Sequence, residues 1–219
     1  MESSTIKPLL FVISGASGSG KKTLIEHVVK LFPDIEHVPT FTTRSPRPHA
    51  QSHIDYIVLD TPEFIRKFEK GEIFECTKTY GDSLYGSPQK ILDVNNPHNL
   101  IIELDYKGMF RVRERSLRRV VSLFILTPDR ETLAKRIEAR SPEKNLDARI
   151  DAAILQNQFA WAYDYVLLNE ELETFLDQVK AVVQAEILKN AGKNLLLHRR
   201  HADDMTLQDL NATFAKPKE

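Results

Sequence analysis

The sequence has very little cysteine, since Cys76 is its single thiol in 219 residues. One thiol cannot form an internal disulfide or a zinc site of several thiolates, and such scarcity is typical of reducing compartments. Long apolar runs are missing as well, because no stretch approaches the roughly 20 residues that a membrane span requires. The opening MESSTIKPLL has neither the charged start nor the long apolar core of a signal peptide. We therefore expect a cytoplasmic protein with no membrane partner.

A marked excess of charge of one sign is also absent. The chain has 30 Lys and Arg against 31 Asp and Glu, which leaves a formal net charge of −1. This balance removes the broad electrostatic attraction that draws basic proteins to polyanions, so no nucleic-acid partner is expected. With 42% hydrophobic and 28% charged residues the chain can bury a core, which excludes wholesale disorder. Its length suits one domain over 1–219.

Four short apolar runs predict strands that are buried on both faces of a parallel sheet, at 9–13, 100–104, 120–126 and 165–168. Glycines and a helical pattern follow the first run, and helical patterns also follow the others. Alternation of short apolar strands with helices is typical of a three-layer α/β sandwich whose sheet is mainly parallel.

The stretch at about 37–95 has a different pattern, with prolines, glycines and short alternating segments such as DYIVLD. The segment TPE at 61–63 predicts a helix start, because a threonine hydroxyl can cap a helix and proline suits its first turn. We interpret this stretch as an inserted small mixed-β subdomain that gives substrate specificity. The core then lies at about 8–36 and 96–190, and a polar tail follows at about 193–219.

The segment GASGSGKKT, between the first strand and the first helix, has the form of a phosphate-binding loop. Its glycines let the backbone wrap so that N–H groups point at a phosphate, and the helix N-terminus adds partial positive charge. Lys21 is placed to reach the β- and γ-phosphates. We expect ATP to contact Gly15, Ala16, Ser17, Gly18, Ser19, Gly20, Lys21, Lys22 and Thr23.

One position departs from the usual form of this loop. A Ser or Thr that ligates Mg²⁺ ordinarily follows the lysine, and Lys22 stands there instead. The nearest hydroxyl is Thr23, which is our candidate Mg²⁺ ligand, helped by the nucleotide and by water. A site that has lost its activity is the alternative.

A second anion-binding segment is TFTTRSPR, in which Arg44 and Arg47 lie three residues apart beside hydroxyl groups. Arginine offers a planar fork for bidentate phosphate binding. Downstream, Glu75 could accept hydrogen bonds from an N–H pair such as the one on a guanine edge. Taken singly, these residues also fit surface arginines and a solvated glutamate.

Taken together, the motifs resemble those of guanylate kinases. GASGSGKKT, TTRSPR, DY, LYGS and ELDYKG stand in that family's order and at similar spacing over about 8–190. The resemblance implies a P-loop nucleoside monophosphate kinase that uses ATP and Mg²⁺ to convert GMP, and by extension dGMP, to the diphosphate. It also implies a GMP-binding insert, a helical lid at about 136–155, and a monomer or homodimer.

The resemblance assigns residues to each part of the site. The residues implied to bind GMP are Thr40, Arg44, Arg47, Tyr56, Glu75, Tyr85, Gly86, Ser87, Glu103 and Asp105. Beyond the loop, those implied to bind ATP are Arg136, Arg140 and Asn169. The implied catalytic set is Lys21, Arg44, Arg136 and Arg149.

The chemistry needs no general base, because the acceptor phosphate is largely ionised at neutral pH. This agrees with the lack of a convincing Ser-His-Asp or Cys-His arrangement in the sequence. Two alternatives stay open: a guanylate-kinase-like binding module, favoured by Lys22 and Ala50, and a P-loop kinase for another phosphorylated acceptor. The arginine-rich run at 111–119 predicts an exposed helix face or turn.

Overall fold

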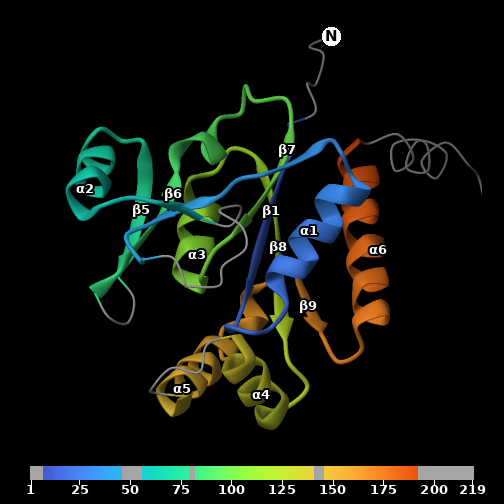
Figure 1. Cartoon of the computed structure of the whole chain (residues 1–219). Coiled ribbons are helices and arrows are strands. Elements are labelled where there is room, and N and C mark those ends of the chain that lie inside the picture. The colour runs from blue at the N-terminus through green and yellow to red at the C-terminus, as the bar shows by residue number, and fades with distance from the viewer. Residues whose placement is uncertain (1–6, 46–55, 79–81, 141–145, 192–219) are drawn as a thin grey trace, which may run out of the picture.

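The computed structural model describes residues 7–45, 56–78, 82–140 and 146–191, and it contains two sheets (Figure 1). The large sheet has five parallel strands in the order β2-β7-β1-β8-β9. Their bounds are β1 Leu9–Gly15, β2 Ile35–His37, β7 Asn99–Glu103, β8 Arg119–Leu126 and β9 Tyr165–Leu168. Strand β1 is central and buried along its whole length, which explains its uninterrupted apolar run.

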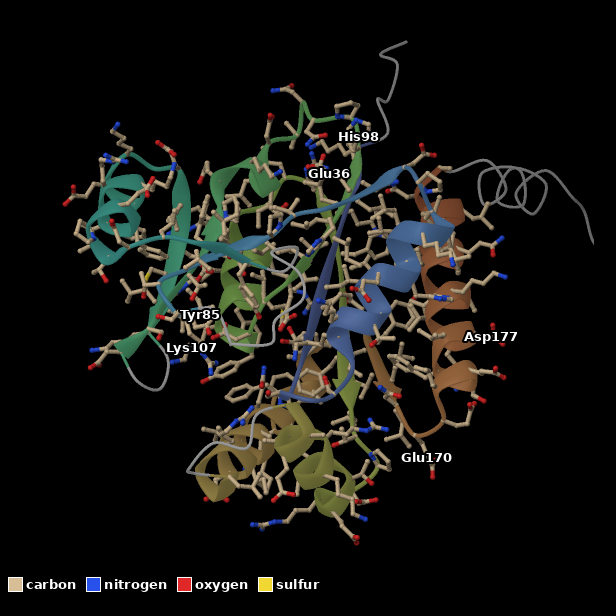
Figure 2. All side chains as sticks on the ribbon, viewed as in Figure 1. Glu36, Tyr85, His98, Lys107, Glu170 and Asp177 are labelled. Atoms are coloured by element: carbon tan, nitrogen blue, oxygen red, sulfur yellow. The ribbon has the colours of Figure 1, made fainter. Side chains whose placement is uncertain are left out.

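Helices cover both faces of the large sheet and give it three layers. Successive residues of β1 point to opposite faces, so Phe11 packs in the cluster that α1 (Lys21–Leu31) and α6 (Leu172–Ala191) complete. Its neighbour Val12 packs in the second cluster, with Met109 and Val112 of α3 (Tyr106–Arg115). Charged side chains lie around the outside, as Asp177 on α6 shows in Figure 2.

The small sheet has four strands in the order β4-β3-β6-β5. They are β3 Thr40–Thr42, β4 Tyr56–Val58, β5 Ile73–Lys78 and β6 Leu84–Pro88, with the 3₁₀ turn η2 (Gln89–Leu92) after them. Strands β3 and β4 are parallel, whereas β6 is antiparallel to both β3 and β5. The sheet is therefore mixed, as predicted for the fold, and it lies within the stretch at 37–95.

Helix α2 (Thr61–Glu69) begins where the TPE segment predicts a helix. Its cap is not the threonine, however. The Asp60 side chain accepts a hydrogen bond of 2.7 Å from the Glu63 backbone N–H, and Thr61 and Pro62 lie in the first turn. The predicted hydroxyl cap is wrong, because an aspartate precedes the threonine and caps a helix at least as well.

Two further helices, α4 (Arg130–Arg140) and α5 (Leu146–Asn157), lie at one end of the large sheet (Figure 1). They pack on each other and on Ala16 of the phosphate loop through Leu133, Ile137 and Ile150. The 3₁₀ turn η3 (Ala160–Ala162) follows α5 and carries Trp161, which is 80% exposed. In the described part of the chain no helix is long and apolar enough to cross a membrane.

Candidate active site

The phosphate loop has a backbone that side chains would obstruct. Gly15 and Gly20 adopt φ values of +146° and +102°, which L-residues with a side chain rarely adopt. A Cβ atom added to Gly20 would lie 2.2 Å from the Asn169 Nδ2 atom, and one added to Gly15 would lie 2.5 Å from the Ile125 carbonyl oxygen. Glycine is therefore required at both positions by conformation and by space.

Lys21 is the best-defined side chain of the loop. Its ammonium donates hydrogen bonds to the Gly15 and Ala16 carbonyl oxygens at 2.7 and 2.8 Å. It also forms an ion pair of 3.5 Å with Glu103 Oε1, and the lysine is buried. The sequence-predicted cation thus lies inside the loop, at the carboxyl end of β1, where ligands bind in open parallel sheets.

Three predicted residues from far along the chain converge on this loop. Asn169 Nδ2 donates to the Ser19 carbonyl oxygen at 2.8 Å. Arg136 Nη1 donates to the Asn169 carbonyl oxygen at 3.0 Å, and Arg149 Nη2 donates to Ser17 Oγ at 3.1 Å. Helices α4 and α5 therefore bring two arginines to the edge of the loop. Of the predicted ATP-binding residues, the Arg140 side chain falls outside the described atoms.

The loop offers little to a metal ion. Lys22 Nζ lies 3.8 Å from Glu26 Oε1, one turn along α1, and Thr23 is exposed. Within the described ranges no three His, Cys, Asp or Glu residues gather into a metal-binding group. These residues do not form a protein cage for Mg²⁺, and the role of Thr23 as a ligand stays a prediction.

The small sheet contains a buried carboxylate, Glu75, on its outer strand β5. The residue is 7% exposed, and its Oε1 atom accepts a hydrogen bond of 2.6 Å from Ser87 Oγ on the neighbouring strand β6. Its Oε2 atom accepts one of 2.8 Å from Arg111 Nη1. Gly86 lies on β6, where an added Cβ would lie 2.6 Å from Ile73 Cγ2 of β5. The alternative interpretation of Glu75 as a solvated glutamate is thereby excluded.

Other predicted residues line the same sheet. Thr40 is buried on β3, and Thr42 Oγ1 accepts a hydrogen bond of 3.1 Å from the Arg44 backbone N–H just beyond that strand. The Tyr56 and Tyr85 rings meet edge to face with centroids 5.8 Å apart. The predicted phosphate ligand Arg47, like Ala50, lies outside the described residues.

Glu103, at the end of β7, joins the two halves of the site. Its Oε1 atom accepts a hydrogen bond of 3.4 Å from the Tyr56 hydroxyl of the small sheet, and the same atom is 3.5 Å from Lys21 Nζ of the phosphate loop. Two residues further, the Asp105 carboxylate caps α3 by accepting a 2.7 Å hydrogen bond from the Gly108 N–H. The two predicted half-sites thus meet at one carboxylate.

Comparison with known proteins agrees with this geometry. The sequence model of the family described as "Guanylate kinase" matches residues 7–186. The chain is 31% identical to the guanylate kinase of Geobacter sulfurreducens over 187 residues, which cover 84% of this chain and 91% of that protein. It is 33% identical to the guanylate kinase of Cereibacter sphaeroides over 186 residues, covering 83% and 88%.

A solved structure is similar as well. The crystal structure of guanylate kinase from Anaplasma phagocytophilum superposes with a TM-score of 0.66 at 29% identity, covering 83% of this chain and 87% of that chain. This chain belongs to the guanylate kinase family.

Within this guanylate kinase family member, the arginine-rich run at 111–119, which the sequence predicts as an exposed helix face or turn, is exposed only in part. Arg111 contacts Glu75 of the candidate site, and the buried Arg118 donates to the backbone carbonyls of Asp93, Asn96 and His98. The prediction holds for the exposed Arg115 and is wrong for the buried Arg118, because local charge density does not reveal pairing with residues that lie 20 or more positions away.

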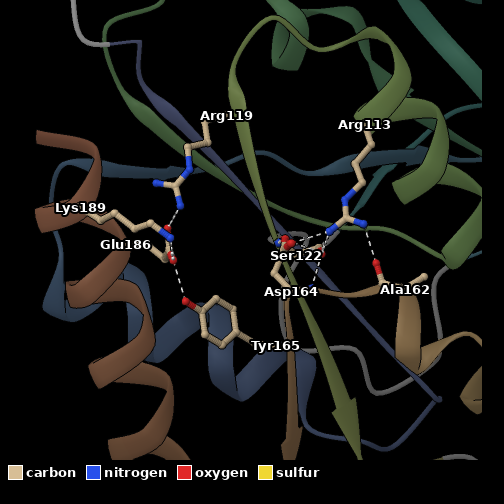
Figure 3. A network of polar contacts seen from close by, with 8 residues as sticks. All are labelled: Arg113, Arg119, Ser122, Ala162, Asp164, Tyr165, Glu186 and Lys189. Atoms are coloured by element: carbon tan, nitrogen blue, oxygen red, sulfur yellow. Dashed lines mark hydrogen bonds and ion pairs between the residues drawn. The ribbon is translucent and has the colours of Figure 1, made fainter. Parts of the chain in front are cut away.

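Two other arginines of that run, Arg113 and Arg119, have structural partners (Figure 3), whereas Arg115 is exposed. Arg113 forms an ion pair of 2.8 Å with Asp164, which also accepts hydrogen bonds from Ser122. These hydrogen bonds and the arginine lower the pKa of the Asp164 carboxyl, although burial opposes them as the largest single influence. Arg119 pairs with the buried Glu186 of α6. Arg113 therefore connects α3 to β8, and Arg119 connects β8 to α6.

Two groups near the small sheet have shifted pKa values. Burial raises the pKa of the Cys76 thiol, and the neighbouring Glu75 carboxylate adds to the effect. Burial also raises the pKa of Tyr163 to about 12. Tyr163 packs edge to face against Phe124 in the cluster that includes Phe74 of β5, so it lies where the small sheet meets the core. Both shifts favour the protonated form of the group.

A ring stack connects α3 with the segment after α5. The Tyr106 and Phe159 rings lie parallel, with centroids 3.9 Å apart and planes 6° from each other. Tyr106 directly follows Asp105 of the candidate site, and Phe159 follows the helix that carries Arg149. The stack therefore links segments that serve the two halves of the site.

Proposed function

We propose that this chain transfers the γ-phosphoryl group of ATP to GMP, giving ADP and GDP. The contact of Glu103 with both Lys21 and Tyr56 carries the proposal, because the phosphate loop and the small sheet then touch the same carboxylate. A donor phosphate in the loop and an acceptor phosphate beside Tyr56 would then be neighbours. Such proximity is the main requirement of phosphoryl transfer.

The reaction forms a bond between the acceptor phosphate oxygen and the γ-phosphorus and breaks the bond from that phosphorus to the β–γ bridging oxygen. The acceptor oxygen carries no proton that must be removed, since the phosphate is largely ionised at neutral pH. The protein must therefore neutralise charge and exclude water. Lys21, Arg44, Arg136 and Arg149 supply the positive charge in this proposal, and α4 with α5 forms the lid.

Guanine is the proposed base because of the pair formed by Glu75 and Ser87. A carboxylate can accept from two adjacent N–H groups, which guanine offers and adenine does not. The buried position of Glu75 excludes competing water and strengthens such bonds. Mg²⁺ is proposed to enter as part of the Mg–ATP substrate, where it neutralises phosphate oxygens. The single thiol fits a cytoplasmic enzyme, which we propose works as a monomer or homodimer.

Two other functions have less support. Lys22 favours a binding module without turnover, whereas the side chains that converge on the loop from Asn169, Arg136 and Arg149 favour an enzyme. A kinase for another phosphorylated acceptor, such as a sugar phosphate, would have no use for the Glu75–Ser87 pair.

The test is ADP production from Mg–ATP with GMP, dGMP, AMP, CMP and UMP supplied separately. We expect turnover with GMP to exceed turnover with AMP by about 100-fold or more, because a site built for specific donors rejects a base that lacks them. Equal turnover with AMP, or no turnover with GMP, would contradict the proposal. Arg44→Ala should abolish turnover without loss of fold, while the exposed Arg66→Ala on α2 serves as the matched control.

A further inference from the structure

Both oxygens of the Glu75 carboxylate are held by protein side chains from different parts of the fold. Ser87 Oγ donates to Oε1 at 2.6 Å from within the small sheet. Arg111 Nη1 donates to Oε2 at 2.8 Å, and Arg111 lies on α3, which packs against the large sheet. The Glu75 side chain is 6% exposed and that of Arg111 is 42% exposed, so the arginine reaches inward to a buried anion.

Arg111 also holds the backbone next to Glu75. The same Nη1 group donates to the Cys76 carbonyl oxygen at 3.1 Å. The guanidinium therefore contacts β5 at two successive residues, one by its carboxylate and one by its main chain. A planar guanidinium with fixed donor directions restricts the rotation of the carboxylate more than a flexible ammonium does.

Each carboxylate oxygen has about two acceptor positions. Ser87 occupies one position on Oε1, which keeps one further position. On Oε2, Arg111 donates at 2.8 Å and the Thr77 hydroxyl donates at 3.5 Å, so a base N–H would replace this long Thr77 hydrogen bond. Two parallel acceptors suit two adjacent N–H groups, the arrangement on the N1 and N2 edge of guanine. Hypoxanthine keeps the N1–H donor but lacks the 2-amino group, so it would use only one of these acceptors.

We propose that Arg111 is a positioning residue for base recognition: it holds Glu75 in the orientation that accepts from both guanine N–H groups. The inference rests on the proposed function and names the residue that sets its base preference. Arg111 acts through Glu75 and lies outside the small sheet, so its hydrogen bonds also connect β5 to α3. Without it a buried carboxylate loses its charge partner, which is costly unless the carboxylate turns away.

The consequence is specific to the acceptor. Loss of Arg111 should weaken GMP binding while leaving the ATP side unchanged, because the phosphate loop contacts Glu103 and not Glu75. It should also narrow the preference for GMP over IMP, since GMP loses two well-placed acceptors and IMP loses one. A residue that merely supported the fold would affect both substrates and kcat alike.

The experiment compares Arg111→Met and Arg111→Lys with Arg115→Met, an exposed arginine on the same helix. KM and kcat are measured for GMP, IMP and ATP, and GMP binding without ATP is measured by calorimetry. In Arg111→Met we expect KM for GMP to rise about tenfold or more with kcat within about threefold, a smaller rise for IMP, and no change for ATP. Arg111→Lys should recover part of the loss, and Arg115→Met should match the wild type.

A double-mutant cycle separates positioning from general support. If Arg111 acts through Glu75, adding Arg111→Met to Glu75→Gln should change KM for GMP by less than about twofold. A full additional tenfold loss in the double variant would overturn the proposal. So would an unchanged or lower KM in Arg111→Met, because the arginine would then be idle or would compete with the base.

The outcomes also separate this proposal from the proposed function. If the wild type fails to turn over GMP, the proposed function fails, and the calorimetric comparison still decides whether Arg111 and Glu75 act together in binding GMP. If Arg111→Met fails to fold, the folded Arg111→Lys variant carries the same comparison. Its KM for GMP should lie above that of the wild type and its KM for ATP should match, and equal KM values for GMP would overturn the proposal.

Discussion

The phosphate loop and the small sheet achieve order in different ways. The loop is one continuous segment, and its Lys21 side chain donates hydrogen bonds to two carbonyl oxygens of the same loop. The small sheet takes its central carboxylate from β5, its hydroxyl from β6 and its arginine from α3. Contiguous residues thus build the phosphate loop itself, although Arg136, Arg149 and Asn169 reach it from far along the chain. The surroundings of Glu75 depend on the tertiary fold throughout. We therefore expect the conformation of the loop to be robust. The geometry around Glu75 should be sensitive to how the small sheet attaches to the core.

Replacement of the loop lysine tests the first half most severely. Lys21→Met removes the one buried ammonium of the loop, so we expect kcat to fall about 1,000-fold, as for loss of a charge that stabilises the transition state. The free energy of unfolding should fall as well, because the Gly15 and Ala16 carbonyl oxygens lose their donor, so kcat is measured under conditions in which the variant is folded. The matched control is Lys30→Met, an exposed lysine in the last turn of the same helix. Retention of more than about a tenth of wild-type kcat would show that the loop does not hold the reacting phosphates.

Attachment of the small sheet depends strongly on Arg118. This buried arginine bonds the carbonyls of Asp93, Asn96 and His98, the segment by which the chain returns from the small sheet to β7. Arg118→Met leaves those carbonyls without a donor, so the free energy of unfolding should fall by about 3 kcal/mol. Urea unfolding measures the change, with Arg115→Met as the exposed control. A difference below about 0.5 kcal/mol between the two variants would contradict this account.

Replacement of Glu75, the proposed base-binding carboxylate, should separate the two halves kinetically. Glu75→Gln keeps the shape of the side chain but replaces one acceptor with a donor, so we expect KM for GMP to rise about 30-fold. KM for ATP should stay unchanged, because the contacts of the phosphate loop do not involve this residue. Steady-state kinetics with each substrate varied in turn give both values. Equal increases for ATP and GMP would show that the half-sites are not separate.

The smallest expected effect concerns pH. Burial raises the pKa of Tyr163 from 10 in the unfolded chain to about 12, so its contribution to stability is complete below pH 10 and is lost as pH rises toward 12. At pH 11 the wild type should have lost about 1.4 kcal/mol relative to Tyr163→Phe, which has no proton to release. Denaturant unfolding of both proteins at pH 8 and pH 11 isolates this difference. A constant difference between the two pH values would contradict the assignment.

The sequence predicts the large sheet well, because its strands are apolar runs that are buried on both faces. It does not reveal β2, a strand of three residues in which Ile35 alone is buried, since so short an element has no periodicity. In the site, the loop follows from contiguous residues. The contact of Arg111 with Glu75 could not be predicted, because the two residues lie 36 positions apart and the sequence around Arg111 indicates only a charged helix.

The ring stack between Tyr106 and Phe159 has a practical consequence for following the enzyme in solution. Trp161, the sole tryptophan of the chain, lies two residues after the stack and is 80% exposed. Its indole emission therefore reports from the segment between α5 and β9 without any attached dye. A shift of α5 would change the surroundings of the indole, because the turn that bears it closely follows that helix. The protein thus contains its own optical probe, two residues from the ring stack that links α3 with the segment after α5.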